Sequence, residues 1–221
     1  MTPTKIQNTR IKNSWPIARE GLPFILTSGV ITLIFLYSGL LSLAIFAGVM
    51  SLFIIFFFRD PQRKNDDFGK TILPPADGKI LGILHLDDAN NPLGEPAVKV
   101  SIFMSVFNVH VNISGRVLKI AYHPGKFFSA NLDKASEHNE NNRITLQTDD
   151  GRKIVFIQIA GLIARRIVCW IKEGDEVKAG QRFGLIRFGS RLDVYLPYDS
   201  RIIAQPHNKV KAGETILGYL S

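Results

Sequence analysis

The chain has 221 residues, of which 46% are apolar, and its net charge at neutral pH is +8. It contains 1 cysteine and 5 histidines. The single cysteine excludes an internal disulfide framework, and the scattered histidines give no metal-ligand spacing, so we expect no metal cofactor. The positive charge suits an anionic partner, either nucleic acid or acidic lipid.

The N-terminal third favours lipid. Residues 1–20 form a basic tail, and residues 21–58 contain no charged side chain. As one helix this run would be about 57 Å long, almost twice the roughly 30 Å of a hydrocarbon core. We therefore expect a membrane anchor folded as a helical hairpin that turns near Ser38-Gly39. It would either span the bilayer twice or lie in one leaflet.

Basic residues flank both ends of this anchor, with Arg59, Arg63 and Lys64 following it. By the positive-inside rule both ends face the cytoplasm. The expected location is the cell membrane, with the rest of the protein on its cytoplasmic side. A lipid-facing chain without interleaved aromatic and basic residues also argues against a nucleic-acid partner.

After a linker at 59–72, residues 73–221 alternate β-rich runs with glycine-marked turns. This pattern predicts a mainly β (α+β) catalytic domain. Asp77 precedes Gly78 in an expected turn before a strand. Further on, Asn108, His110 and Asn112 share one face by the strand period of two. That polar row is either an edge-strand surface or part of a site.

A short repeat surrounds the most informative stretch of this domain. Val-Lys-Ala-Gly occurs at 177–180 and again at 210–213, each time between β-like runs. The two copies resemble the half-repeats of biotinyl and lipoyl carrier domains, which form a small sandwich and present a lysine at the tip. Here the segment between them contains Gly189-Ser190 and no lysine at that tip.

The Gly189-Ser190 pair predicts self-cleavage. Gly189 lacks Cβ, so a nucleophile can approach its carbonyl group closely. Attack by Ser190 Oγ gives an ester, elimination releases the Gly189 carboxylate, and hydrolysis of the resulting dehydroalanine leaves a pyruvoyl group on residue 190. That ketone forms a Schiff base with an amine and accepts the electrons released with CO2. Two alternatives stay open: a carrier-like adaptor with an inert Gly-Ser tip, and a pyruvoyl decarboxylase of a soluble amino acid.

Eight motifs in order make the chain similar to the short, prokaryotic type of phosphatidylserine decarboxylase proenzyme. They are Phe-Phe-Arg-Asp-Pro (57–61), Pro-Ala-Asp-Gly-Lys (75–79), Phe-Met-Ser (103–105) with Asn-Val-His-Val-Asn (108–112), Pro-Gly-Lys-Phe (124–127), Asp-Lys-Ala-Ser (133–136), Asn-Glu-Asn-Asn (139–142), Ile-Ala-Gly-Leu-Ile-Ala-Arg-Arg-Ile-Val (159–168) and Arg-Phe-Gly-Ser-Arg (187–191).

The resemblance implies a membrane-associated proenzyme that cuts itself without hydrolysis between Gly189 and Ser190. The products are a β chain (1–189) and an α chain (190–221) that begins with the pyruvoyl group made from Ser190, its only cofactor. The two chains stay together as a heterodimer, and a higher oligomer is left open. The implied reaction converts phosphatidylserine into phosphatidylethanolamine and CO2. The motif match assigns acid/base roles to Asp77 and His110.

One departure bears on substrate binding. The family pattern leads us to expect Arg-x-Pro soon after Asn112, whereas this chain continues directly with Ile113-Ser114-Gly115. The missing arginine would suit an anionic group of the substrate, since a guanidinium binds carboxylates and phosphates through two parallel hydrogen bonds. The candidates to replace it are Arg165, Arg166, Arg187 and Arg191.

Overall fold

A computed structural model describes residues 17–59, 69–104, 108–129, 138–162, 167–186 and 190–221. The chain divides into two compact units. One is a helical unit within residues 11–62, and the other is a β-rich unit that contains residues 63–221.

The helical unit is a hairpin. After a short 3-10 turn (η1, Arg19–Gly21), helix α1 spans Leu22–Tyr37 and helix α2 spans Leu41–Phe57. The chain reverses at Gly39, whose φ of 72° is in the left-handed region that glycine tolerates best. Thr32 Oγ1 and Ser51 Oγ, 3.3 Å apart, form a hydrogen bond between the helices. The predicted turn near Ser38-Gly39 is confirmed.

Of the two arrangements expected for the hairpin, the one that spans the bilayer twice is not supported. With 16 and 17 residues the helices are about 24–26 Å long, which is less than the roughly 30 Å of a hydrocarbon core. No helix in the described part of the chain combines the length and hydropathy needed to cross a membrane. The reversal at Gly39 divides the apolar run into two helices, and each of them is shorter than a hydrocarbon core is thick.

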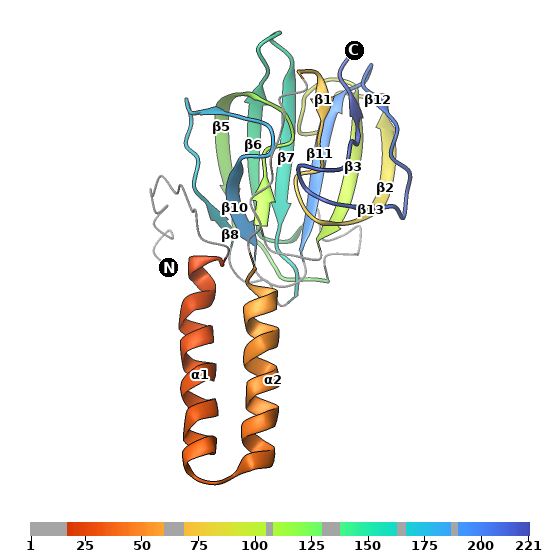
Figure 1. Cartoon of the computed structure of the whole chain (residues 1–221). Coiled ribbons are helices and arrows are strands. Elements are labelled where there is room, and N and C mark those ends of the chain that lie inside the picture. The colour runs from red at the N-terminus through yellow and green to blue at the C-terminus, as the bar shows by residue number, and fades with distance from the viewer. Residues whose placement is uncertain (1–16, 60–68, 105–107, 130–137, 163–166, 187–189) are drawn as a thin grey trace. The chain divides into compact units, whose positions relative to one another are not determined.

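The described residues of the β-rich unit form fourteen strands, arranged as one curled sheet of eight and two sheets of three (Figure 1). The eight-stranded order is β13-β2-β3-β11-β7-β6-β5-β9, and the small sheets are β1-β14-β12 and β4-β10-β8. The strands are β1 Thr71–Ile72, β2 Gly78–Leu86, β3 Ala97–Met104, β4 Asn108–His110, β5 Gly115–His123, β6 Asn141–Gln147, β7 Lys153–Ile159, β8 Ile167–Cys169, β9 Glu176–Val177, β10 Arg182–Ile186, β11 Arg191–Pro197, β12 Arg201–Ile202, β13 Lys209–Val210 and β14 Gly218–Tyr219.

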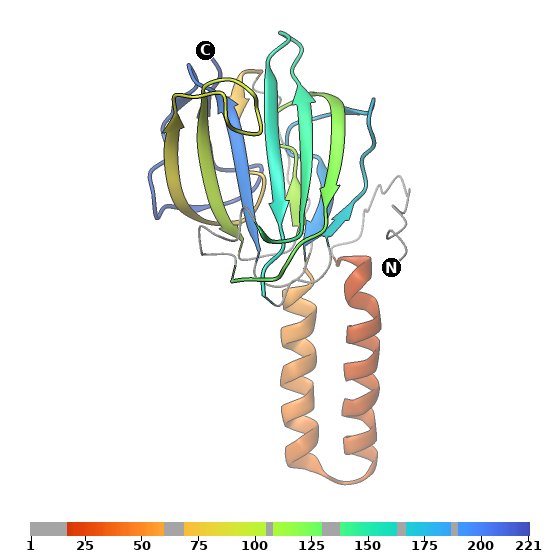
Figure 2. The same cartoon turned by 180° about the vertical axis from the view of Figure 1, so that it is seen from behind.

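The main core is formed by the inner face of the curled sheet and side chains of the small sheets. Phe156 of β7 meets Phe183 of β10 with ring centroids 4.9 Å apart. The outer face carries a smaller cluster in which Leu93, from the loop after β2, packs with Tyr195 of β11; Figure 2 shows this side. Because both faces of β11 are covered, all of its residues except the last are buried.

The β-rich unit is an internal duplication that extends well beyond the short sequence repeat. We call β1–β3 with β11–β14 the split half, and β4–β10 the inserted half, because the second lies in the chain between β3 and β11. Each half supplies four neighbouring strands to the large sheet and forms one small sheet. The small carrier-like sandwich expected from the repeat is not what the structure contains. The two Val-Lys-Ala-Gly copies instead pair with β5 and with β2, at opposite edges of the large sheet.

Reciprocal hydrogen bonds fix which residues correspond. Leu73 N donates to Asn112 O at 2.8 Å, and His110 N donates to Pro75 O at 2.7 Å. In the first bond the donor is in the split half and the acceptor in the inserted half, and in the second bond these roles are reversed. The two donors are therefore equivalent, and His110 occupies the position in the inserted half that Leu73 has in the split half. The repeat turns match in the same way, since Gly180 and Gly213 have φ values of 72° and 69°.

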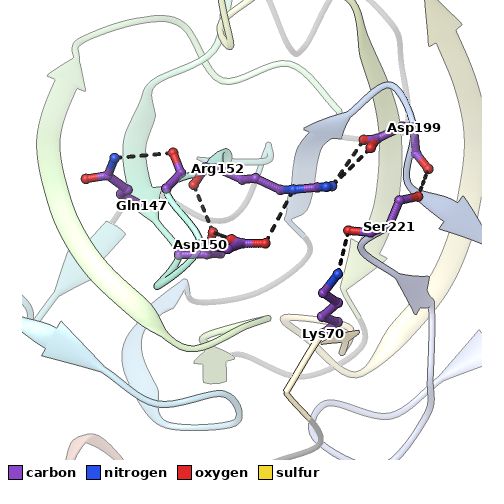
Figure 3. Close-up of polar contacts among 8 residues, drawn as sticks. Lys70, Gln147, Asp150, Arg152, Asp199 and Ser221 are labelled. Carbon is purple, nitrogen blue, oxygen red and sulfur yellow. Dashed lines mark hydrogen bonds and ion pairs between the residues drawn. The ribbon is translucent and has the colours of Figure 1, made fainter.

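The same exchange relates Ser190 to Arg152. Met104 N donates to Ser190 O at 2.9 Å, and Thr148 N donates to Arg152 O at 2.9 Å. In the inserted half these residues close a tight hairpin, and the Arg152 side chain is ion-paired with Asp150 and Asp199 (Figure 3). In the split half the whole inserted half separates Met104 from Ser190. Ser190 thus directly precedes β11, the strand with which the chain returns from the inserted half.

Candidate active site

Ser190 lies at the inner face of the large sheet, where β11 begins. Its side chain is buried, with 1% of the residue exposed, and Oγ donates a hydrogen bond to Met104 Sδ at 3.0 Å. Met104 belongs to the main core, so the hydroxyl faces an apolar interior. A thioether sulfur is only a weak hydrogen-bond acceptor. This contact therefore does not remove the proton from the Ser190 hydroxyl group, which stays neutral. The neighbouring Gly189, the other half of the predicted cleavage site, lies outside the described residues.

Asp77 ends the bend that precedes β2, as the Asp-Gly signal predicted. Its Oδ1 accepts a hydrogen bond from Ala212 N at 2.7 Å. In the inserted half the corresponding bond runs from Ala179 N to Ser114 Oγ at 3.0 Å. The hydroxyl group of Ser114 is thus sufficient to accept this hydrogen bond in the inserted half. The turn in the split half therefore does not require the negative charge of Asp77.

His110 ends strand β4 and is buried, with 7% exposed. Its counterpart Leu73 is buried in the split half with 3% exposed. The backbone position therefore accepts an apolar side chain, and the imidazole adds a polar group that the fold does not need there. Asn112, which was predicted to share its face, is fully buried.

The backbone brings the predicted catalytic residues to one end of the core. Gly78, next to Asp77, pairs with Met104, and Met104 in turn binds the backbone of Ser190. Asp77 and Ser190 are therefore about two strand spacings apart, on the order of 10 Å. His110 N binds Pro75 O, in the same bend as Asp77. The three residues thus come from three segments that these backbone hydrogen bonds and strand pairs link together.

Arg191 does not join them. As the residue after Ser190 it points to the opposite face of the sheet, where Nε lies 2.6 Å from Asp193 Oδ1 and Nη2 donates to Ser101 Oγ at 2.9 Å. The guanidinium is thus engaged in a buried network on the outer face. The other arginines predicted to bind an anion, at 165, 166 and 187, lie outside the described residues.

Comparison with known proteins decides which family this site belongs to. The family model described as phosphatidylserine decarboxylase matches residues 50–218, well over half of the chain. The chain belongs to the phosphatidylserine decarboxylase family. The resemblance seen in the eight motifs is thereby confirmed, and the protein is an enzyme of the carboxy-lyase class rather than a carrier-like adaptor.

Individual relatives agree over nearly their whole length. The chain is 53% identical over 206 residues to a phosphatidylserine decarboxylase proenzyme of Syntrophus aciditrophicus, covering 91% of this chain and 96% of that one. It is 50% identical over 208 residues to the proenzyme of Desulfotalea psychrophila, covering 93% and 97%. For the proenzyme of Geotalea uraniireducens the values are 48% over 214 residues, 96% and 99%.

The structure of this decarboxylase also contains a buried polar pair that was not predicted from the sequence. Gln158 of β7 and Asn142 of β6 are buried on the inner face, and Asn142 Nδ2 donates to Gln158 Oε1 at 2.8 Å. Asn142 was noted only as part of a motif. The available signal for Gln158 was its place two residues after Phe156 in an apolar strand, where alternation puts a polar side chain in the core.

Cys169 lies beside this pair and is partly buried. Burial raises the pKa of its thiol to about 11. A raised thiol pKa disfavours the thiolate, the nucleophilic form, so the side chain has the character of a packing residue. No three His, Cys, Asp or Glu side chains come together as a metal site within the described residues.

Gly78 explains why the decarboxylase motif has glycine after Asp77. A Cβ at this position would lie 2.1 Å from Phe103 O, a backbone atom that cannot move without breaking the β2–β3 pairing. We expect Gly78→Ala to displace Asp77 and to lower both the yield of cleaved chain and the melting temperature. Gly82→Ala in the same strand is the control, because its Cβ would meet nothing within 4 Å. Equal cleavage and stability in the two variants would contradict this packing argument.

Proposed function

We propose that this chain decarboxylates phosphatidylserine to phosphatidylethanolamine and CO2 after cutting itself between Gly189 and Ser190. Family membership supports the overall reaction. The main observation that supports the proposed active site is that equivalent positions of the two halves differ in polarity. His110 and Gln158 stand where the other half has Leu73 and Leu196. The polar groups that the fold does not need gather at the Ser190 end.

The self-cleavage uses groups of this chain and one water molecule. Ser190 Oγ attacks the Gly189 carbonyl carbon, the C–N bond breaks, and an ester joins the two residues. Removal of the Ser190 α-proton then expels the Gly189 carboxylate. The remaining dehydroalanine takes up water and releases ammonia, which leaves a pyruvoyl group. His110 is suited to accept the hydroxyl proton, since imidazole titrates near neutral pH. Asp77 would stabilise the imidazolium from the neighbouring bend.

The surroundings of residue 190 fit a pyruvoyl group. An ordinary hydrolytic cut would leave a charged ammonium at a position with 1% exposure, and burying an unpaired charge is costly. A pyruvoyl cap is neutral and close in size to the serine. The hydrogen bond from Met104 N to the carbonyl of residue 190 is independent of the group on its other side, so this residue stays anchored after the cut.

The pyruvoyl group would supply a ketone that condenses with the substrate's primary amine and accepts the electron pair left when CO2 departs. His110 would then return a proton to the substrate carbon that lost CO2. For the substrate's phosphate we keep Arg165, Arg166 and Arg187 as candidate ligands, since a guanidinium matches phosphate geometry. Arg191 is a weaker candidate because its Nε and Nη2 already bind Asp193 and Ser101.

The cut chains would remain together as a heterodimer. The α chain contributes β11, which is hydrogen-bonded to β3 on one side and β7 on the other. It also contributes β13 and β14, which pair with β2 and β1. Because β11 is a central strand with both faces covered, its loss would open the whole core.

The test is a decarboxylation assay with purified cleaved protein. Phosphatidylserine in mixed micelles should yield phosphatidylethanolamine and CO2, whereas free serine should yield none. Turnover of free serine at a comparable rate would favour a soluble amino acid as the substrate. The absence of CO2 from the lipid, with the chain fully cut, would refute the proposed reaction.

We further propose that the helical hairpin holds the protein on the cell membrane, on its cytoplasmic side, by inserting into the lipid surface without crossing it. Its helices contain no charged residue and expose large apolar side chains, including Leu33, Phe46 and Leu52 at 65–67%. Such a surface is unfavourable in water and typical of lipid contact. Arg59, stacked 4.1 Å from the Phe56 ring centroid at the end of α2, suits anionic headgroups.

Replacing Leu33, Phe46 and Leu52 together with aspartate should weaken binding to anionic vesicles by more than about 100-fold, because each apolar side chain contributes roughly 1.5–3 kcal/mol when buried. Vesicle flotation measures this directly. Leu84→Asp in β2, also exposed at 55%, is the control and should float like the unaltered protein. Flotation of the triple variant with the vesicles would contradict the hairpin's role.

A further inference from the structure

Gln158 has a hydrogen-bond donor that no described residue accepts. Its side chain is fully buried, and Nε2 has no hydrogen-bond partner among the residues that the structure describes. An unsatisfied buried amide costs about 1–3 kcal/mol, so its presence in a well-packed core calls for an explanation.

The orientation of this amide is fixed by its neighbour. Asn142 Nδ2 donates to Gln158 Oε1 at 2.8 Å. In this bond the Asn142 amino group faces the Gln158 carbonyl oxygen. The Gln158 carbonyl oxygen is thereby occupied, and Nε2 is the atom left to bind another molecule.

Gln158 faces the same interior as Ser190. In the ladder between β7 and β11, Gln158 pairs with Leu192, so Gln158 and Ser190 are diagonal neighbours on one face. Such positions have Cα atoms roughly 7–8 Å apart, within reach of a long side chain. On the opposite small sheet, Gly184 provides room, because a Cβ there would lie 3.1 Å from Gln158 Nε2.

The duplication shows that packing alone does not require this pair. In the split half the corresponding cross-strand pair is Val98 and Leu196, and both residues are fully buried. The fold thus accommodates an apolar pair at the same place. Only the half that faces Ser190 has the polar pair.

We propose that Gln158 Nε2 donates a hydrogen bond to the carboxylate of the serine headgroup and so selects a substrate that carries one. This inference rests on the proposed function. A neutral donor suits this task better than an arginine. A guanidinium would stabilise the carboxylate more than the departing neutral CO2 and would raise the barrier, whereas an amide orients the carboxylate with less ground-state stabilisation.

The test measures binding to the cleaved enzyme rather than turnover. Two lipid probes lack the reactive amine: a diacylglycerol phosphodiester of 3-hydroxypropanoate, which keeps the carboxylate, and one of ethanol, which lacks it. Titration calorimetry in mixed micelles gives each Kd. The unaltered enzyme should prefer the carboxylate probe. Gln158→Leu should reduce that preference roughly 10- to 100-fold, the value of one hydrogen bond to a charged group, and leave the ethanol probe unaffected.

A second variant acts through Gln158 without changing volume. In Asn142→Asp the new carboxylate has no N–H to donate, so the Gln158 amide should turn, give Nε2 to that carboxylate and present its carbonyl oxygen to the substrate. The preference for the carboxylate probe should be lost again. Gln147→Leu in β6 is the control, because Gln147 Nε2 binds Gly151 O in the distant hairpin (Figure 3). It should keep the full preference.

The outcomes separate this inference from the function on which it rests. A preference that survives both Gln158→Leu and Asn142→Asp would overturn the role of Gln158, as would variants whose only defect is slower self-cleavage. An unaltered protein that stays uncut, or that is cut but releases no CO2 from phosphatidylserine, would instead refute the proposed function itself.

Discussion

A chain in which Ser190 is replaced by alanine is expected to remain a single polypeptide of about 24.7 kDa without decarboxylase activity. Alanine has no oxygen to attack the Gly189 carbonyl group, so neither the ester nor the later elimination can occur. The fold should be intact, because the Ser190 side chain makes only a weak bond to Met104 Sδ. Denaturing gel electrophoresis and a lipid decarboxylation assay measure the two losses.

Two further substitutions sharpen this result. Ser190→Cys should cut slowly, since a thiol can form the corresponding thioester. Ser200→Ala, ten residues later and also buried, should cut as the unaltered protein does, because its hydroxyl has no role in the scheme. A cleaved Ser190→Ala chain would refute the scheme.

Replacement of Asp193 by alanine should lower stability by about 3–5 kcal/mol, the usual effect of removing one partner from a buried ion pair. Asp193 is fully buried between Arg191 Nε at 2.6 Å and Lys99 Nζ at 3.2 Å. Without it the Arg191 guanidinium stays buried with an uncompensated charge. For a chain of this size the melting temperature should fall by roughly 6–20 °C.

Asp199→Ala is the matched control, because that carboxylate pairs with Arg152 at 3.1 Å in an exposed setting. Surface pairs contribute only about 0–1 kcal/mol, so its melting temperature should hardly change. Thermal unfolding followed by circular dichroism compares the two variants. Equal melting temperatures would mean that Arg191 finds other compensation and is available to bind an anion.

For the helical hairpin, composition predicted the helices and the turn but not the length of each helix. The uncharged run predicted helices and their turn, because both follow from local sequence. Its total length suggested two membrane spans, but Gly39 and the residues beside it use part of the run. Each helix therefore falls short of a hydrocarbon core.

The duplication was visible in the sequence only where side chains repeat. Val-Lys-Ala-Gly recurs because both copies need a buried valine and a glycine with positive φ. Elsewhere the halves share backbone hydrogen bonds, which different residues can satisfy. Ser114 and Asp77 cap equivalent turns, and Gly174 and His207 share a positive φ. Such equivalences become visible only once strand pairing is known.

The candidate site was predicted in part for the same reason. Ser190, His110 and Asp77 belong to motifs with a chemical rationale, and the strand pairing brings their segments together. Gln158 has no local motif. Its interest comes from an unused donor and from its counterpart Leu196, and both depend on the three-dimensional arrangement.

The most direct test of the account is the intact mass of the purified active protein under denaturing conditions. We predict two chains, residues 1–189 and residues 190–221, with the smaller one carrying a pyruvoyl group in place of an N-terminal serine. Active protein that consists of one uncut chain with an ordinary serine at position 190 would contradict it.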